Sequence, residues 1–184
     1  MRREEIIHAL GAEWRHPVAP ELYDPRMYQR VELLRGKISI IDEWLPEYRS
    51  GGATVLDFSC GTGALLEVMR YYGNEILGAD IQYFEFLESQ GLPYQYVNGR
   101  FLPYPFSDRS WDLLTCIGSI STYHQPWRDV VTEFCRIARK HVFLVVNVGE
   151  EFERRKHELI GWAPDGWRLD VHRRSAFRWA RLGN

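Results

Sequence analysis

The sequence predicts an α/β fold with a doubly wound, mainly parallel sheet that carries helices on both of its faces. The main observation is that, from residue 54 onward, short apolar segments alternate with segments of helical periodicity. Such alternation is typical of parallel strands joined by crossover helices. A second observation is that residues 142–148 are almost entirely apolar, as expected for a strand buried on both faces.

One long helix is predicted before this alternating region, over residues 25–45. Asp24 is a favourable N-cap residue, and Pro25 suits the first helical position. Apolar residues then recur at steps of three and four residues, which marks the buried stripe of a helix. This stripe consists of Val31, Leu34, Ile38, Ile41 and Leu45. Residues 1–20 are mixed in character and are expected to lie at the periphery.

The remaining elements follow the alternation. Strands are predicted over residues 54–58, 75–79, 94–97, 111–117 and 142–148. Helices are predicted over residues 63–72, 83–90, 126–139 and 150–160, and the segment 167–182 is expected to supply one or two edge strands. In such sheets ligands bind beyond the carboxyl ends of the strands, near the point where the strand order reverses. Functional residues are therefore expected just after the strands, near residues 58–63, 80, 98–102 and 117–124.

The turn after the first strand, from Asp57 to Gly63, is the most informative segment. Gly61 and Gly63 let the backbone turn sharply and approach a ligand closely. The helix that follows presents free N–H groups to an anionic group, and Asp57 places a carboxylate nearby. A ligand with both a carboxylate and an ammonium group suits this pairing. A second acid, Asp80, follows the next strand at the spacing where such folds bind ribose hydroxyls.

These motifs resemble those of class I S-adenosylmethionine (SAM)-dependent methyltransferases, which have a Rossmann-like fold. Their first motif, approximately V-L-D-x-G-C-G-T-G, matches residues 55–63 except that Ser59 replaces a glycine. Residues 104–112, Y-P-F-S-D-R-S-W-D, are similar to the family signature L-P-F-x-D-x-S-F-D. The resemblance covers residues 55–148, and it implies a compact version of the methyltransferase fold with SAM as the cofactor.

The resemblance also implies which residues contact SAM. Asp57, Gly61 and Gly63 would surround its methionine end, and Asp80 would bind its ribose. Further expected contacts are Ser59, Cys60, Ile81, Asn98, Gly99, Arg100, Phe101, Ile117 and Gly118. The family often has an acid facing the adenine amino group where this chain has Arg100. Asn98 or backbone groups could accept that hydrogen bond instead, with Phe101 against the ring.

Methyl transfer from a sulfonium is an in-line displacement, so the protein mainly aligns the reacting atoms. His124, which follows the fourth strand, is the first candidate for a general base, with Tyr123 beside it. The alternative is that His124 caps the next helix or bonds to the backbone. Asp112 lies at the opposite end of its strand and is assigned a structural role.

An aromatic lid over the acceptor is expected from Trp14, His16, Tyr23 and Tyr28. The alternative is that Tyr28 belongs to the buried helix stripe and that Trp14 anchors the N-terminal arm. The basic residues Arg168, His172, Arg173, Arg174, Arg178 and Arg181 could bind an anionic acceptor or RNA. We favour the solvated face of an edge strand, where charge blocks further sheet pairing.

The chain is expected to form one domain over residues 1–184, with a helical cap or lid at 1–50, a SAM-binding core at 53–148, and a helix and edge strands at 149–184. The predicted activity is methyl transfer to an O or N atom of a small molecule. The alternatives are SAM binding or sensing without turnover, and methylation of nucleic acid or protein. With a formal net charge of −2, nucleic acid is an unfavoured partner.

Further expectations concern cellular context. Cys60, Cys116 and Cys135 lack C-x-x-C spacing, and no H-E-x-x-H arrangement occurs, so neither a disulfide framework nor a metal site is predicted. No apolar run approaches the ~18 residues of a membrane span, and the first residues do not resemble a secretory signal. A cytoplasmic monomer or homodimer is expected.

Overall fold

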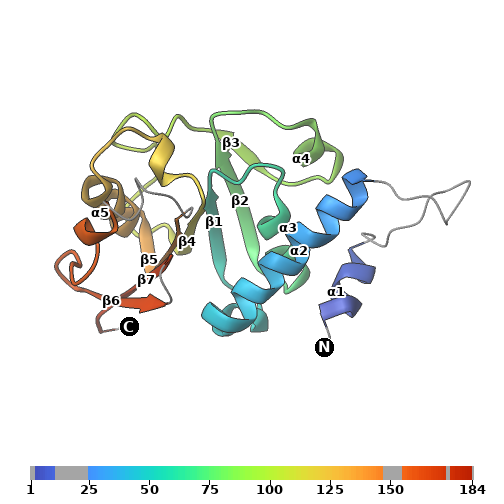
Figure 1. The fold of residues 1–184 in the computed structure, drawn as a ribbon, viewed down its shortest axis with the longest axis horizontal. Coiled ribbons are helices and arrows are strands. Elements are labelled where there is room, and N and C mark those ends of the chain that lie inside the picture. The colour runs from blue at the N-terminus through green and yellow to red at the C-terminus, as the bar shows by residue number, and fades with distance from the viewer. Residues whose placement is uncertain (1–2, 11–24, 147–154, 173–174, 184) are drawn as a thin grey trace, which may run out of the picture.

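The computed structural model describes residues 3–10, 25–146, 155–172 and 175–183. Its centre is a seven-stranded sheet in the order β3-β2-β1-β4-β5-β7-β6 (Figure 1). The strands are β1 (Thr54–Phe58), β2 (Glu75–Asp80), β3 (Tyr94–Tyr96), β4 (Trp111–Ile117), β5 (Ala138–Val145), β6 (Trp167–His172) and β7 (Ala176–Arg181). Strands β1 to β5 pair in parallel, whereas β7 is antiparallel to both β5 and β6. The predicted mainly parallel sheet is confirmed, and the segment 167–182 supplies two strands, of which β6 lies at the edge.

Helices cover both faces of the sheet, as the sequence predicts. The α-helices are α1 (Arg3–Ala9), α2 (Pro25–Trp44), α3 (Ala64–Tyr71), α4 (Glu85–Ser89) and α5 (Trp127–Ile137). Short 3-10 helices are η1 (Pro46–Ser50), η2 (Ile120–Thr122) and η3 (Lys156–Glu158). Because strand side chains alternate in direction, Leu56 of β1 packs in the core beneath α5, and its neighbour Val55 packs in the core beneath α2 and α3.

The strand order reverses between β1 and β4, which lie side by side at the centre of the sheet. The chain runs outward from β1 to β2 and β3, and then crosses to the other side of β1 to form β4. Loops that leave the carboxyl ends of these two strands diverge, and the space between them is the usual ligand site of a doubly wound sheet.

The N-terminal helix α1 was not predicted. Its Ile6 and Ile7 are 2% and 3% exposed, so it packs as part of the core that contains α2. Glu4 also accepts hydrogen bonds from Arg35 of α2. Seven residues are too few to show helical periodicity in a mixed sequence, and burial against α2 stabilises this helix.

The junction between α5 and β5 differs from the prediction, which placed a helix over 126–139 and a strand over 142–148. Helix α5 ends at Ile137 and β5 begins at the next residue. Arg181 of β7 donates hydrogen bonds to the carbonyl oxygens of Cys135 and Ala138, and the Ser110 N–H donates to that of Ile137. Donors from distant segments thus bond to the carbonyl groups at the point where the sequence predicts two further helical residues.

The predicted helix over residues 150–160 falls largely outside the described residues. Residues 147–154 lie outside the described part of the chain, Arg155 is α-helical and the 3-10 helix η3 follows it, so the helix is described only at this point and its earlier part stays a prediction. The proposed division of the domain into a cap, a core and a C-terminal part stays a prediction. No helix in the described ranges combines the length and apolarity that crossing a bilayer requires.

Asp112 has the structural role that its position predicts. Its carboxylate accepts hydrogen bonds from the N–H and hydroxyl of Thr54 on β1, and it forms ion pairs with Arg139 and Lys140 of β5. Burial acts to raise the pKa of Asp112, but the Thr54 N–H and the two cations hold it below its ordinary value. Asp112 therefore joins the three central strands at the amino edge of the sheet.

We predict that Asp112→Ala lowers the free energy of unfolding by about 1–3 kcal/mol, because the Thr54 N–H is then left without an acceptor. Asp170→Ala is the matched control, since Asp170 forms an ion pair with the exposed Arg168. Such a surface pair contributes about 0–1 kcal/mol. Urea denaturation measures both variants, and equal losses would contradict the assigned role of Asp112.

Candidate functional site

A cleft of about 390 Å³ lies at the carboxyl edge of the sheet, between the loops that follow β1 to β4. Its position is the one that the sequence predicts for the functional residues. The lining residues are Ser59, Gly61, Asp80, Ile81, Gln82, Phe84, Val97, Asn98, Gly99, Arg100, Ser119, Thr122 and Tyr123. Each of them follows or ends a strand or lies in the loop beyond it.

Gly61 and Gly63 serve different purposes in the turn after β1. Both have positive φ, at 54° and 81°, which glycine adopts without strain. A Cβ atom on Gly63 would lie 2.6 Å from Leu87 and 2.8 Å from Leu92, so Gly63 allows α3 to pack closely against its neighbours. A Cβ on Gly61 would meet nothing within 4 Å. Gly61 therefore presents bare backbone to the open cleft.

Asp80 at the end of β2 is held by two backbone donors. One carboxylate oxygen accepts a hydrogen bond from the Gly61 N–H at 2.9 Å, and the other accepts from the Gln82 N–H at 3.0 Å. A carboxylate has about four acceptor sites, so both oxygens can accept a further bond. Asp80 lines the cleft and can accept two adjacent hydroxyl groups, as the ribose of SAM requires.

Asp57 lies beneath this cleft and is only 4% exposed. Its carboxylate accepts a hydrogen bond from the Thr115 hydroxyl of β4 at 2.7 Å. Burial raises the pKa of Asp57 to about 6, while the positive charge of Lys37 and the Thr115 bond act to lower it. Asp57 is thus a buried carboxylate at the strand crossing, with its counter-charge on helix α2.

Lys37 was missed by the sequence reasoning. Burial lowers the pKa of this half-buried lysine, and the charge of Asp57 opposes that shift. The available signal was its place in the helix, because Lys37 falls three residues after Leu34 and four before Ile41, on the apolar stripe itself. A charged residue at such a position indicates a nearby opposite charge.

Ser59 and Tyr123 join two loops across the floor of the cleft. Ser59 occupies the position where the resembling family has glycine, and its φ is 60°. Its hydroxyl lies 2.5 Å from the hydroxyl of Tyr123, which is also 3.4 Å from the sulfur of Cys116. Tyr123 is 4% exposed. The serine therefore supplies a hydrogen-bond partner to a phenol that would otherwise have only a thiol.

Gly99 completes this arrangement. A Cβ atom on Gly99 would lie 2.7, 2.8 and 3.0 Å from carbon atoms of the Tyr123 ring. Tyr123 is thus wedged between the loops that follow β1 and β3. Burial raises the pKa of Tyr123 well above its ordinary value, so the phenol stays protonated. Tyr123 thus has a structural contact in the wall of the cleft, and a catalytic role for it stays a prediction.

Asn98 and Arg100 line the cleft and are bonded to each other and to the segment after β4. The Asn98 side-chain oxygen accepts a hydrogen bond from the Arg100 N–H at 3.0 Å. Gln125 donates to the Arg100 carbonyl, and the Arg100 guanidinium donates to the Thr122 carbonyl. Phe101 is 70% exposed and does not line the cleft, so its expected contact with adenine has no support in this geometry.

Other predicted cofactor residues lie behind the cleft wall rather than in it. Cys60 is buried against Gly78, where a Cβ atom would lie 2.7 Å from the Cys60 sulfur. Ile117 ends β4, and Gly118 follows with a φ of 83°. The sequence reasoning missed Gln82, Phe84 and Val97, although their place at or just after strands was a usable signal, whereas Ser119 and Thr122 fall within the segment 117–124 where functional residues are expected.

The proposed base, His124, is exposed, has a φ of 60° and does not line the cleft. Within the described residues it makes no side-chain cap to α5, whose N-cap is Pro126. Trp14, His16 and Tyr23 lie outside the described residues. Tyr28 belongs to α2, but the lid itself stays a prediction. No group of three or more potential metal ligands occurs within the described ranges.

The sheet order and the cleft at its switch point define a Rossmann-like methyltransferase fold. A family model described as a methyltransferase domain matches residues 56–146. Together with the fold, this match shows that the chain belongs to the class I SAM-dependent methyltransferases, and it is an enzyme of that class. No curated protein matches the chain in sequence.

Solved structures support the fold. Magnesium protoporphyrin IX methyltransferase from Synechocystis PCC 6803, with bound demethylated SAM (SAH), has a TM-score of 0.58 at 11% identity, covering 97% of this chain and 94% of that one. A SAM-dependent methyltransferase from Aquifex aeolicus has a TM-score of 0.55 at 15% identity, covering 99% of each chain. A protein from Pyrococcus horikoshii OT3 has a TM-score of 0.58 at 18% identity, covering 80% of this chain and 90% of that one.

We predict that the Ser59–Tyr123 hydrogen bond appears as coupling in a double-mutant cycle. Ser59→Gly leaves the buried Tyr123 hydroxyl with only the Cys116 thiol, although glycine relieves the strain of the positive φ. Tyr123→Phe leaves the partly buried Ser59 hydroxyl without its partner. The double variant should lose about 1 kcal/mol less free energy of unfolding than the sum of the losses in the two single variants. Urea denaturation of the four proteins gives this coupling energy. Strictly additive losses would show that the two hydroxyl groups do not interact.

Proposed function

We propose that this enzyme transfers the methyl group of SAM to an O or N atom of a small molecule. The observation that carries the proposal is the fixed Asp80 carboxylate, which faces a cleft beside the bare backbone of Gly61. We infer that Asp80 binds the ribose, that Gly61 lets the cofactor pass close to the turn, and that Asp57 attracts the methionine ammonium group from below.

The basic strand near the end of the chain supports a small acceptor over RNA. Arg178 is half-buried and donates to the Trp44 carbonyl and to Glu47. Arg181 donates to backbone carbonyls around the end of α5, and Arg168 pairs with Asp170. Arg178 and Arg181 therefore bond within the protein, whereas Arg168 is exposed, as expected for the solvated strand face that the sequence suggested. An RNA-binding track needs cations with free donors.

The reaction needs alignment of acceptor, methyl carbon and sulfur, with the cleft excluding water. A base is needed only where the acceptor loses a proton before or during transfer. His124 stays a candidate for that role. The cytoplasmic location and the monomeric or homodimeric state of the enzyme also stay predictions. SAM binding without turnover is the competing proposal, and a screen of O and N acceptors with tritiated SAM separates the two.

We predict that Asp80→Ala weakens SAH binding by more than about tenfold, because two charge-assisted hydrogen bonds to ribose are lost. Asp80→Asn is the control, since the amide oxygen still accepts one bond, and its loss should be smaller. Isothermal calorimetry gives both affinities, and circular dichroism verifies that both Asp80 variants fold. Unchanged affinity in Asp80→Ala would refute the ribose assignment.

We also predict that SAH affinity falls as the pH drops through about 6, the pKa to which burial raises Asp57. Only the ionised carboxylate attracts an ammonium group, so the loss approaches about tenfold per pH unit below that value. The effect on stability has the opposite sign. The contribution of Asp57 is greatest below about pH 3.9, its unfolded value, and is lost as the pH rises through about 6.

Calorimetric titrations between about pH 5 and about pH 7 measure this dependence. Asp57→Asn is the matched variant, because it keeps the size of the side chain and removes its titration. Its SAH affinity should be weaker and nearly independent of pH across this range. A wild-type affinity that is flat over the same range would contradict the role of Asp57.

A further inference from the structure

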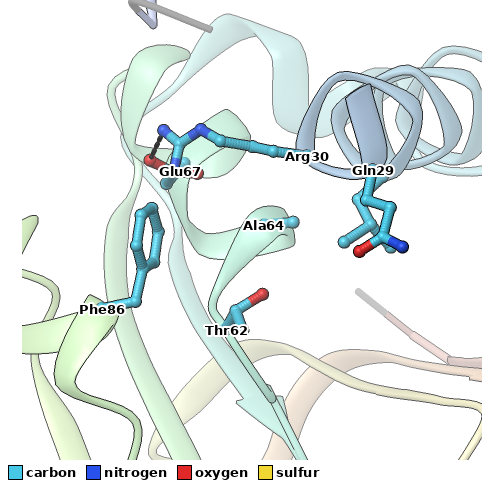
Figure 2. Close-up of a pocket in the computed structure, with 7 residues that line it drawn as sticks. Gln29, Arg30, Thr62, Ala64, Glu67 and Phe86 are labelled. Atoms are coloured by element: carbon cyan, nitrogen blue, oxygen red, sulfur yellow. Dashed lines mark hydrogen bonds and ion pairs between the residues drawn. The ribbon is translucent and has the colours of Figure 1, made fainter. Parts of the chain in front are cut away.

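A second pocket, of about 300 Å³, lies on the other side of the glycine turn. It opens between α2, the start of α3, and α4, as Figure 2 shows. Its lining residues are Gln29, Arg30, Leu33, Thr62, Ala64, Glu67 and Phe86. Thr62 follows Gly61 directly, so one turn of the chain contributes to the walls of both cavities.

The walls of this second pocket are largely apolar. Phe86 and Gln29 lie on opposite sides of it, and Ala64 lies between them (Figure 2). Leu33 is 48% exposed at its rim, although leucine on a helix that packs on a core is more often buried. Leu33, Ala64 and Phe86 line one concave surface, and concave, mainly apolar sites are where small apolar ligands bind.

The charged residues of the pocket neutralise each other. Arg30 donates to Glu67 at 2.7 Å, with side chains that are 17% and 3% exposed. The guanidinium also lies over the Phe86 ring, 4.5 Å from its centre. The pair carries no net charge, and a ligand anion would have to compete with Glu67 for Arg30. The pocket therefore favours an uncharged ligand, with Gln29 and Thr62 as its neutral polar groups.

We propose that this pocket holds the uncharged aromatic or aliphatic body of the methyl acceptor, with its hydroxyl or amine directed toward the Thr62 side. The inference rests on the proposed function, because only a cofactor bound at the neighbouring cleft makes an occupant of this pocket an acceptor. It adds the substrate class, which is a neutral apolar molecule of about the size of a two-ring aromatic compound.

The test uses 2-naphthol as the probe and 2-naphthoate, its charged analogue of similar shape, as the control. Saturation-transfer NMR on the full chain with SAM should show binding of 2-naphthol and at least about tenfold weaker binding of 2-naphthoate. Interligand NOEs should connect the naphthol ring to the S-methyl group of SAM. Tighter binding of the anion, or binding of both molecules without interligand NOEs, would overturn the proposal.

Leu33→Trp fills the pocket from its exposed rim, where the larger side chain does not disturb the core. It should weaken 2-naphthol binding by about tenfold or more and leave SAH affinity unchanged. Leu182→Trp is the matched control, because Leu182 is 60% exposed and lines a different pocket. Equal naphthol affinity in the two variants would overturn the acceptor pocket while leaving the proposed function intact.

Failure of the proposed function gives a different result. If the wild-type chain does not bind SAH in calorimetry, the methyl-transfer proposal is refuted, and the acceptor assignment is refuted with it. Asp80→Ala separates the sites further, because Asp80 lines only the cofactor cleft, so this variant should lose more SAH affinity than 2-naphthol affinity. Equal losses of both affinities would show that the two cavities are not separate sites.

Discussion

The hydrogen bonds of the Asp80 carboxylate to Gly61 and Gln82 hold the candidate site together. They connect the loop after β1 to the loop after β2, which are neighbouring strands on one side of the switch point. Parallel pairing fixes the strands, but it does not fix the loops beyond them. A single side chain that accepts from both loops sets their separation, and with it the shape of the cleft.

The floor of the cleft depends on a second contact of the same kind. Ser59 and Tyr123 connect the loop after β1 to the loop after β4, and Gly99 leaves the space that the tyrosine ring occupies. Because this floor is fixed by bonds within the protein, the cleft is largely formed before a ligand arrives. Preorganisation of this type lowers the conformational cost of binding. The buried Asp57 adds charge to this rigid frame, offset by Lys37.

The sequence predicts elements well where one local pattern decides them. The apolar stripe of α2 and the glycine turn before α3 both fall where periodicity and turn chemistry place them. The predictions fail where an element depends on residues that lie far away in the chain. The end of α5 depends on Arg181, and α1 depends on burial against α2. In the site, strand ends were predictable, whereas the burial of Tyr123 follows from Gly99 and Ser59, which no local pattern connects to it.

The position of β7 between β5 and β6 has a consequence for synthesis of the chain. On the ribosome, β5 is complete before β7 exists, so one edge of a strand that ends in the apolar residues 142–145 stays without hydrogen-bond partners. The last carbonyls of α5 also lack the arginine that later bonds to them. The nascent domain must therefore pass through a stage with an open, aggregation-prone sheet edge, and closing that edge also completes the helix.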